Sequence, residues 1–271
     1  MNTEILIRFV AFSGVLLLMA SWERLAPCRR LTTSKLRRWA ANLGVVALNT
    51  IVVRLVFGTG VVGTAMFVTG HGWGLLNRVS WSPWFEAILA VVVLDFILYL
   101  QHVMLHAVPV FWRFHMMHHA DLDCDVTTGV RFHPVEVAIS MVIKSGAIIV
   151  IGASPAAVLT FEVLLNATSM FNHSNAQMPA AVDRVLRWFL VTPDMHRIHH
   201  SILPQETNRN FGFNLPWWDR LLGTYCATPE GGHKGMTLGL EQFRNSAHLT
   251  LTGILLLPFF GKPGRYPLGR R

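Results

Sequence analysis

The stretch that decides the fold runs from Asp95 to His119 and reads DFILYLQHVMLHAVPVFWRFHMMHH. It carries five histidines, spaced as H-x3-H and then H-x2-H-H: His102, His106, His115, His118 and His119. The H-x2-H-H spacing returns later in the chain, as His196, His199 and His200. Neutral imidazole is the commonest protein ligand of transition metals. Because these eight histidines exceed what one metal can coordinate, the sequence predicts a two-metal centre.

The composition indicates a membrane protein. Of 271 residues, 52% are hydrophobic and only 14% are charged, well below the roughly 25% that is usual in a soluble domain. The net charge of +8 could suggest a nucleic-acid partner. The basic residues stand beside apolar spans, however, and this argues against nucleic acid. Three cysteines without a C-x-x-C pair support neither a disulfide framework nor an iron–sulfur cluster.

The apolar segments predict an all-α membrane bundle of three spans followed by a helical hairpin. The expected spans are residues 5–21, 43–70 and 85–105, and the hairpin arms are residues 135–153 and 155–172. A cleaved signal peptide is the alternative for the first span, but the bulky, basic flank after it offers no small-residue cleavage site. The apolar segment 249–260 is too short to span a bilayer, so we expect it at the interface.

Basic residues predict the orientation of the bundle. Six of them lie in the first linker and mark it as cytoplasmic: Arg24, Arg29, Arg30, Lys35, Arg37 and Arg38. The next connection, 71–83, has only Arg78, so it and the N-terminus are expected outside. Three spans and a hairpin then place every histidine box on the cytoplasmic side, as a histidine-rich metal-binding cap. The basic tail, 262–271, is also expected there.

Two polar residues precede the first histidines on the same helix. Asp95, Tyr99, His102 and His106 are spaced four, three and four apart, and therefore share a face. An acid at membrane depth is costly and commonly orients a metal-bound imidazole. We therefore expect Asp95 and Tyr99 to support the metal ligands without binding the metal themselves. Pairing of Asp95 with Arg54 is the alternative.

Further candidates lie after the first boxes. A polar stripe marks the second hairpin arm: Glu162, Asn166, Ser169 and His173. We expect His173 to be a ninth metal ligand, whereas His133 either binds metal, caps a helix or supports a ligand. The segment 107–134 is expected to be irregular. Its Asp-x-Asp-x-Asp run (121–125) lacks the Gly and Glu of a calcium loop, so a solvated loop is expected.

The choice of metal is open between iron and zinc at this point, since both bind imidazole. An all-histidine two-metal site with open positions suits iron and O2. The chain has no H-E-x-x-H, the zinc peptidase motif. Haem bound between helices is the other alternative, but its two ligands would need two histidines, not eight in tight boxes.

The histidine spacings, with Asp95 and Tyr99 before them and the segments Phe211-Gly212 and WDRLLGTY (218–225) after them, resemble the sterol desaturase/fatty acid hydroxylase superfamily. Two positions depart from the family pattern, Val103 where Arg is frequent and Ser169 where some members have His. The resemblance implies an integral membrane, non-haem di-iron enzyme that activates O2 on a lipid. It also implies a separate electron donor, because the chain shows no b5-type or iron–sulfur module.

The resemblance divides the chain into an N-terminal transmembrane region (1–84), a catalytic domain (85–240) and an interfacial C-terminal tail (241–271). The expected function is hydroxylation of a C–H bond in an acyl, alkyl or sterol chain of a membrane lipid. Desaturation is the second possibility, and a non-catalytic metal- or lipid-binding membrane protein is the third. The basic linker and tail would either dock an acidic donor or contact anionic lipid headgroups.

Overall fold

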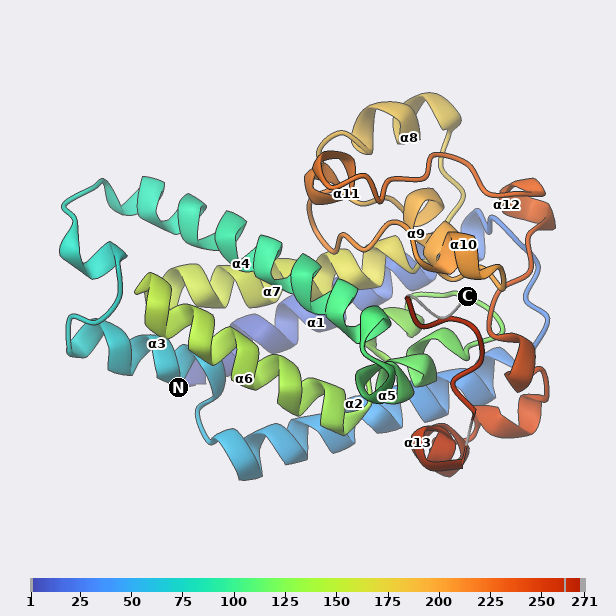
Figure 1. The fold of residues 1–271 in the computed structure, drawn as a ribbon, viewed down its shortest axis with the longest axis horizontal. Coiled ribbons are helices and arrows are strands. Elements are labelled where there is room, and N and C mark those ends of the chain that lie inside the picture. Colours follow the sequence, from blue (N-terminus) through green and yellow to red (C-terminus); the bar gives the residue numbers. More distant parts are fainter. Residues whose placement is uncertain (1, 261, 269–271) are drawn as a thin grey trace.

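Five long helices run side by side along the long axis of the molecule (Figure 1). The structure is a computed structural model that describes residues 2–260 and 262–268. The long helices are α1 (Asn2–Leu25), α2 (Lys35–Phe57), α4 (Pro83–Ala107), α6 (Pro134–Ile151) and α7 (Pro155–Asn172). The described residues are helices, turns and two isolated β-bridges. The predicted all-α bundle is therefore confirmed.

Short helices gather at one end of the bundle and form a cap (Figure 1). They are α5 (Pro109–His119), α8 (Ala180–Leu186), α9 (Pro193–His199), α10 (Pro204–Thr207), α11 (Trp217–Leu221) and α12 (Gly232–Gly235). The first linker, 26–34, reaches the same end, whereas the connection 71–82 and the start of α1 lie at the opposite end (Figure 1). The cap and the first linker thus share one end, as the order of the spans predicts.

Four helical segments are long and apolar enough to cross a membrane: Thr3–Leu25, Lys35–Gly70, Pro83–Ala107 and Pro134–Ile151. The second differs from the expected span, because it begins eight residues earlier, at Lys35, and is broken between α2 and α3 (Gly60–Gly70). Gly58 and Gly60 flank the break with φ of 59° and 64°. Such φ values strain every residue that has a Cβ, so glycine permits the break.

The helical hairpin forms as predicted. Gly152 ends α6 in the left-handed conformation, with φ of 79°, and the Ser154 side chain caps α7 by accepting from the Ala157 amide. Between the arms, the buried Lys144 ammonium lies 2.5 Å from a Glu162 carboxylate oxygen, and Arg8 of α1 lies 3.3 Å from the other oxygen. The charge of Lys144 is therefore neutralised inside the bundle.

The segment 107–134 is not the solvated, irregular loop that we expected. Its first half is α5, and its aspartates are buried, with Asp121 and Asp125 fully inaccessible. The guanidinium of Arg38, from α2, is buried against them: Nε donates to Asp121 (2.6 Å) and Nη1 donates to Asp125 (2.6 Å). Asp123 accepts hydrogen bonds from the amides and hydroxyls of Thr32 and Thr33. Periodicity missed this cluster because its charges are satisfied by residues distant in sequence.

Burial alone would raise the pKa of Asp121, but Arg38 and Arg131 lower it to about 2. Asp121 is therefore ionised at neutral pH and contributes stability that is fully present above pH ~4 and lost as the pH falls toward 2. The ion cluster of Arg38, Asp121 and Asp125 ties the start of α2 to the loop that follows α5.

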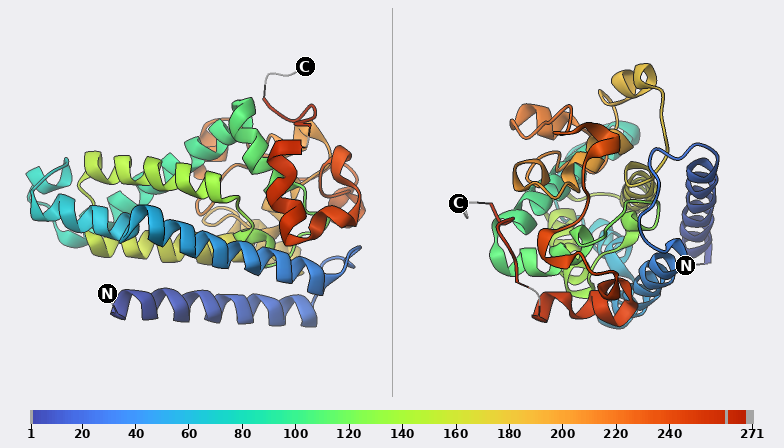
Figure 2. Two further views of the ribbon diagram at one scale, coloured as in Figure 1. Left: turned by 90° about the horizontal axis from the view of Figure 1, so that it is seen from below. Right: turned by 90° about the vertical axis from the view of Figure 1, so that its right-hand side faces the viewer.

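The C-terminal segment contains a helix and contacts the cap. Helix α13 (Leu251–Phe260) runs crosswise to the long helices (Figure 2) and packs on α5 and α2. A helix that lies across the spans near the cap has the orientation of an interfacial helix. The chain then returns over the cap, where its residues 263–268 contact the histidine-bearing helices.

We predict that Arg38→Gln destabilises the protein by about 3–5 kcal/mol, because it removes the cation that contacts both buried carboxylates and leaves only Arg131, 3.9 Å from Asp121. Arg37→Gln is the matched control, since Arg37 is exposed and such changes cost within about 0.5 kcal/mol. Chemical unfolding in detergent micelles, followed by tryptophan fluorescence, measures both. Equal stability of the two variants would contradict the structural role of the ion cluster.

Candidate metal centre

Nine histidines converge where the cap meets the bundle. His102 and His106 lie in the last turns of α4, three lie in α5, His173 follows α7, and the others lie on α9 or follow it. Each is at most 1% exposed. Pro109 ends α4 and starts α5, and Pro193 starts α9, because proline is favoured in a first helical turn and disfavours helix in the residue before it. These breaks turn the boxes toward one another.

The nine histidines form two groups, and within each group the nitrogens lie within 4.8 Å of one another. The five-histidine group consists of His102, His106, His115, His119 and His199. The four-histidine group consists of His118, His173, His196 and His200. The adjacent pairs 118/119 and 199/200 are each divided between the groups, because neighbouring residues point to different sides of the chain. Adjacent histidines therefore serve two different groups.

Hydrogen bonds fix the tautomers of the central imidazoles. Nδ1 of His102 lies 2.7 Å from the Phe211 carbonyl, Nδ1 of His199 lies 2.8 Å from the Arg209 carbonyl, and Nδ1 of His173 lies 2.7 Å from the Ser169 carbonyl. A carbonyl oxygen can only accept, so each Nδ1 donates its proton. In a neutral ring the Nε2 atom then carries a lone pair, which is the form that binds a metal.

These lone pairs face one another at short range. The Nε2 atom of His102 lies 3.0 Å from that of His199, and the Nε2 atom of His173 lies 3.0 Å from those of His118 and His196. Two imidazole ligands at right angles, each about 2.1 Å from a shared ion, would be about 3.0 Å apart. Without a proton between them, facing lone pairs repel. A cation in each group removes the repulsion, so the residues fit a metal pair.

Imidazole nitrogens without a hydrogen-bond partner, and lowered pKa values of the histidines, also agree with a metal pair. Both ring nitrogens of His200, and Nε2 of His106, are buried without a hydrogen-bond partner. Burial, and then neighbouring imidazoles, lower the pKa of His118, His119 and His200 well below its usual value. Neutral rings with free lone pairs are what a metal requires.

Glu136 supports the five-histidine group and was missed by the sequence reasoning. Its Oε1 accepts from Nδ1 of His115 at 2.8 Å, the arrangement of a carboxylate that orients a metal-bound imidazole. Glu136 stands in the first turn of α6, where an acid is favoured by the helix dipole in any protein. The sequence pattern therefore offered no signal that set it apart.

The hydrogen-bond partners of Asp95 and Tyr99 among the described residues are not imidazoles. The Asp95 carboxylate accepts from Trp218 Nε1 at 2.8 Å and from the amides of Asn214 and Leu215 at 3.3 Å. Arg54, its alternative partner, is exposed. Asp95 thus anchors the segment 211–218. In that segment the Phe211 carbonyl oxygen accepts a hydrogen bond from His102 Nδ1. The influence of Asp95 on the site is indirect.

Tyr99 anchors the same segment from its other side. Its hydroxyl lies 2.9 Å from the Thr224 hydroxyl, which donates to Asp219 at 2.6 Å. Asp219 in turn accepts from the amides of Phe211 and Gly212, both at 2.8 Å. The Phe-Gly and Trp-Asp-Arg segments noted in the sequence therefore form the backbone support of His102.

His133 lies outside both groups. Its Nδ1 atom accepts from the Val135 amide at 3.1 Å and so caps α6, and its Nε2 atom lies 3.3 Å from the Leu255 carbonyl. The structure therefore gives it the capping role, which was one of the possibilities for this residue.

The C-terminal segment supports His106. The Asn208 side chain accepts from His106 Nδ1 at 3.1 Å and donates to the Tyr266 carbonyl at 2.8 Å. The amide of Leu268 donates to the His106 carbonyl at 2.9 Å. Trp112, which packs against His106, donates to the Pro263 carbonyl at 2.9 Å. Residues of the C-terminal tail, which was expected at the interface, are thus part of the site's scaffold.

Fold and site together define a membrane helical bundle with a buried polyhistidine cap. The chain belongs to the fatty acid hydroxylase family, whose pattern matches residues 87–224, just over half of the chain. This confirms the resemblance to the sterol desaturase/fatty acid hydroxylase superfamily. With four candidate spans, the protein is an integral membrane protein.

The chain is similar in sequence to proteins named as lipid hydroxylases or monooxygenases. An ornithine lipid hydroxylase of Rhizobium tropici is 31% identical over 150 residues, which cover 55% of this chain and 44% of that protein. The alkylglycerol monooxygenases of Xenopus tropicalis and Homo sapiens are each 30% identical over 62% of this chain, and the match covers 36% and 37% of their lengths. The matched region is thus less than half of each relative. No solved structure matches.

We predict that the protein binds two metal ions, one in each group. His199→Ala should remove an ion from the five-histidine group and His118→Ala from the four-histidine group. Each change should weaken binding by more than the ~10- to 100-fold that is typical when a group that only orients a ligand is lost. Both variants should still insert, because the spans are unchanged. His71→Ala, at an exposed position in the connection 71–82, is the control.

Elemental analysis of protein purified without chelators measures the metal content. Two ions retained by both variants would contradict the ligand assignment, and a single zinc without iron in the native protein would contradict an iron pair.

Proposed function

We propose that this protein oxidises a C–H bond in a membrane lipid with O2, using two iron ions held by the nine histidines. The observation that carries the proposal is the pair of imidazole groups with facing Nε2 lone pairs, buried where the cap meets a membrane bundle. Iron would supply the activation of O2, whereas zinc has no redox chemistry. The names of the relatives, hydroxylase and monooxygenase, support the same class of reaction.

Several side chains would favour such a reaction. Burial of every imidazole excludes water, which protects reactive species from side reactions. The centroids of the Phe213 and His102 rings lie 4.9 Å apart, and Phe132 stacks on His118 with a centroid distance of 4.7 Å. Phe213 belongs to the apolar core of the bundle, and Phe132 packs against that core. An alkyl chain that approached through the bundle would meet an apolar surface beside each group.

Hydroxylation is our first choice of outcome, and desaturation is the second. Both begin with removal of a hydrogen atom from the lipid, and they differ in the step after it. In hydroxylation one oxygen atom of O2 enters the lipid and the other leaves as water, which requires two electrons and two protons. We propose that a separate donor delivers the electrons from the cap side.

The test is to supply the iron-loaded protein, in vesicles of its host's lipids, with a chemical reductant and ¹⁸O-labelled O2. Mass spectrometry of the lipids should show a product that gains one labelled oxygen atom. A product that loses two hydrogen atoms without labelled oxygen would instead identify a desaturase. His199→Ala should lose roughly 100-fold or more in rate, while His71→Ala should keep its rate. Iron-loaded protein that leaves all lipids unchanged would favour a non-catalytic metal- or lipid-binding protein.

We also propose that the cap faces the cytoplasm, because the first linker, at the cap end, carries most of the early positive charge. Arg30, in the first linker, and Ser80, in the connection 71–82, are both exposed, and these two segments lie at opposite ends of the bundle (Figure 1). In a variant lacking Cys28 and Cys226, Ser80→Cys should react with a membrane-impermeant maleimide added to intact cells, and Arg30→Cys should react only after lysis. The reverse pattern would place the cap outside and overturn the proposed route of the electrons.

A further inference from the structure

An open hollow lies between α1 and the start of α2, near the cap end of the bundle. Its volume is about 480 Å³, and it is lined by Leu17, Ala20, Ser21, Arg24 and Lys35. It exists because α1 packs on α7, at the outer edge of the bundle, and so leaves space beside α2 (Figure 2). The volume falls within the roughly 300–1,000 Å³ of small-molecule sites.

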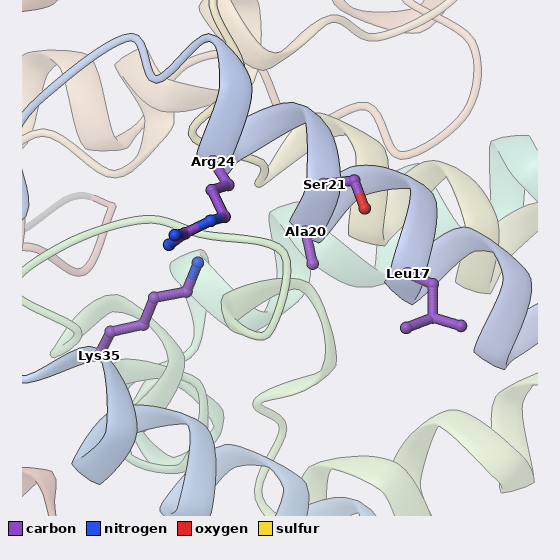
Figure 3. A pocket seen from close by; sticks show the side chains of 5 residues that line it. All are labelled: Leu17, Ala20, Ser21, Arg24 and Lys35. Carbon is purple, nitrogen blue, oxygen red and sulfur yellow. The ribbon is translucent and has the colours of Figure 1, made fainter.

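Two cations face each other across this hollow. The side chains of Arg24, from α1, and Lys35, from α2, point toward one another (Figure 3). Lys35 also stands in the first turn of α2, which has no acidic residue, although a helix N-terminus carries positive partial charge and favours anions. Three positive features therefore meet at one place.

Carboxylates of the chain only partly compensate for this charge. Among the described residues no carboxylate pairs with Arg24. Lys35 lies 3.4 Å from one oxygen of Glu23, whose other oxygen already accepts from the amides of Val126 and Asn175. Like charges that face each other in a partly shielded site repel, and an anion between them reverses the sign of the interaction.

The other walls of the hollow suit a lipid. Leu17 and Ala20 stand below Arg24 on α1, and Leu17 is 67% exposed. These residues belong to the span Thr3–Leu25 near its cap end, at the depth where phosphate headgroups meet acyl chains. An apolar wall that continues from a pair of cations matches a molecule with an anionic head and a hydrocarbon chain.

We propose that this hollow binds an anionic phospholipid, with the phosphate between Arg24 and Lys35 and an acyl chain along Leu17. This site uses none of the nine histidines and does not depend on the proposed oxidation. Through Glu23, which bridges Lys35 and the amide of Asn175, the lipid would also brace the turn that follows His173.

The test is native mass spectrometry of detergent-solubilised protein titrated with phosphatidylglycerol or phosphatidylcholine. The native protein should bind one phosphatidylglycerol in preference to phosphatidylcholine. The double variant Arg24→Gln/Lys35→Gln should bind it about 30-fold more weakly, since each basic residue near anionic lipid contributes about fivefold. Arg30→Gln/Arg37→Gln loses the same charge from exposed positions outside the hollow and should bind as the native protein does.

Ser21→Trp gives a second line of evidence if the double variant fails to fold. Ser21 is exposed and lines the hollow, so a bulky side chain there should weaken phosphatidylglycerol binding while both cations remain. If both double variants lost phosphatidylglycerol binding equally, the lipid would be attracted by the overall positive charge and not by the hollow. Equal binding of phosphatidylcholine would mean that the anion is not recognised. Full displacement by equimolar inorganic phosphate would mean a soluble-anion site. Each of these results would overturn the proposal.

Discussion

The interaction on which this structure most depends is the hydrogen bond by which an acceptor holds one nitrogen of a buried, neutral imidazole and leaves the other nitrogen free for a metal. In the five-histidine group the acceptors for His102, His106 and His199 come from the segment 208–211, and Glu136 serves His115. In the four-histidine group, His173 uses a carbonyl of the helix that precedes it. Because these acceptors come from widely separated segments, the cap must fold as one unit around the histidines.

The buried ion cluster of Arg38, Asp121 and Asp125 solves a second problem, which is how a polar cap is held against an apolar bundle. Hydrophobic attraction between helices is weak within a bilayer, so directional contacts must set the geometry. Arg38 makes four hydrogen bonds to the loop that follows α5 and a fifth to the Thr128 hydroxyl. A planar guanidinium with donors in fixed directions suits this role better than an ammonium. The loop in turn fixes the start of η2 (Thr128–Val130), next to His118 and His173.

The sequence was sufficient to predict the helical class, the hairpin and the nine histidines that converge, because each depends on local spacing, but not how the histidines divide between the two groups. Apolar length defines a span, and repeated H-x2-H-H boxes identify the ligand candidates. The interpretations that failed all concerned partners distant in the chain. The aspartates 121–125 were expected in water because Arg38 stands far away in sequence, and the direct partners of Asp95, which lie in the segment 214–218, could not be foreseen. Periodicity carries no information on such pairs.

The contacts of the C-terminal tail with the histidine scaffold were also missed from the sequence, for a related physical reason. Its basic, glycine- and proline-containing sequence resembles that of a solvated tail, yet Pro263, Tyr266 and Leu268 contact the scaffold through backbone atoms. Backbone hydrogen bonds place almost no demand on side-chain identity, so they leave no mark in a single sequence. Asn208 contributes through its side chain, since its amide accepts from His106 and donates to the Tyr266 carbonyl at once. Together with the Leu268 amide, which donates to the His106 carbonyl, this side chain links the C-terminal segment to the first histidine box.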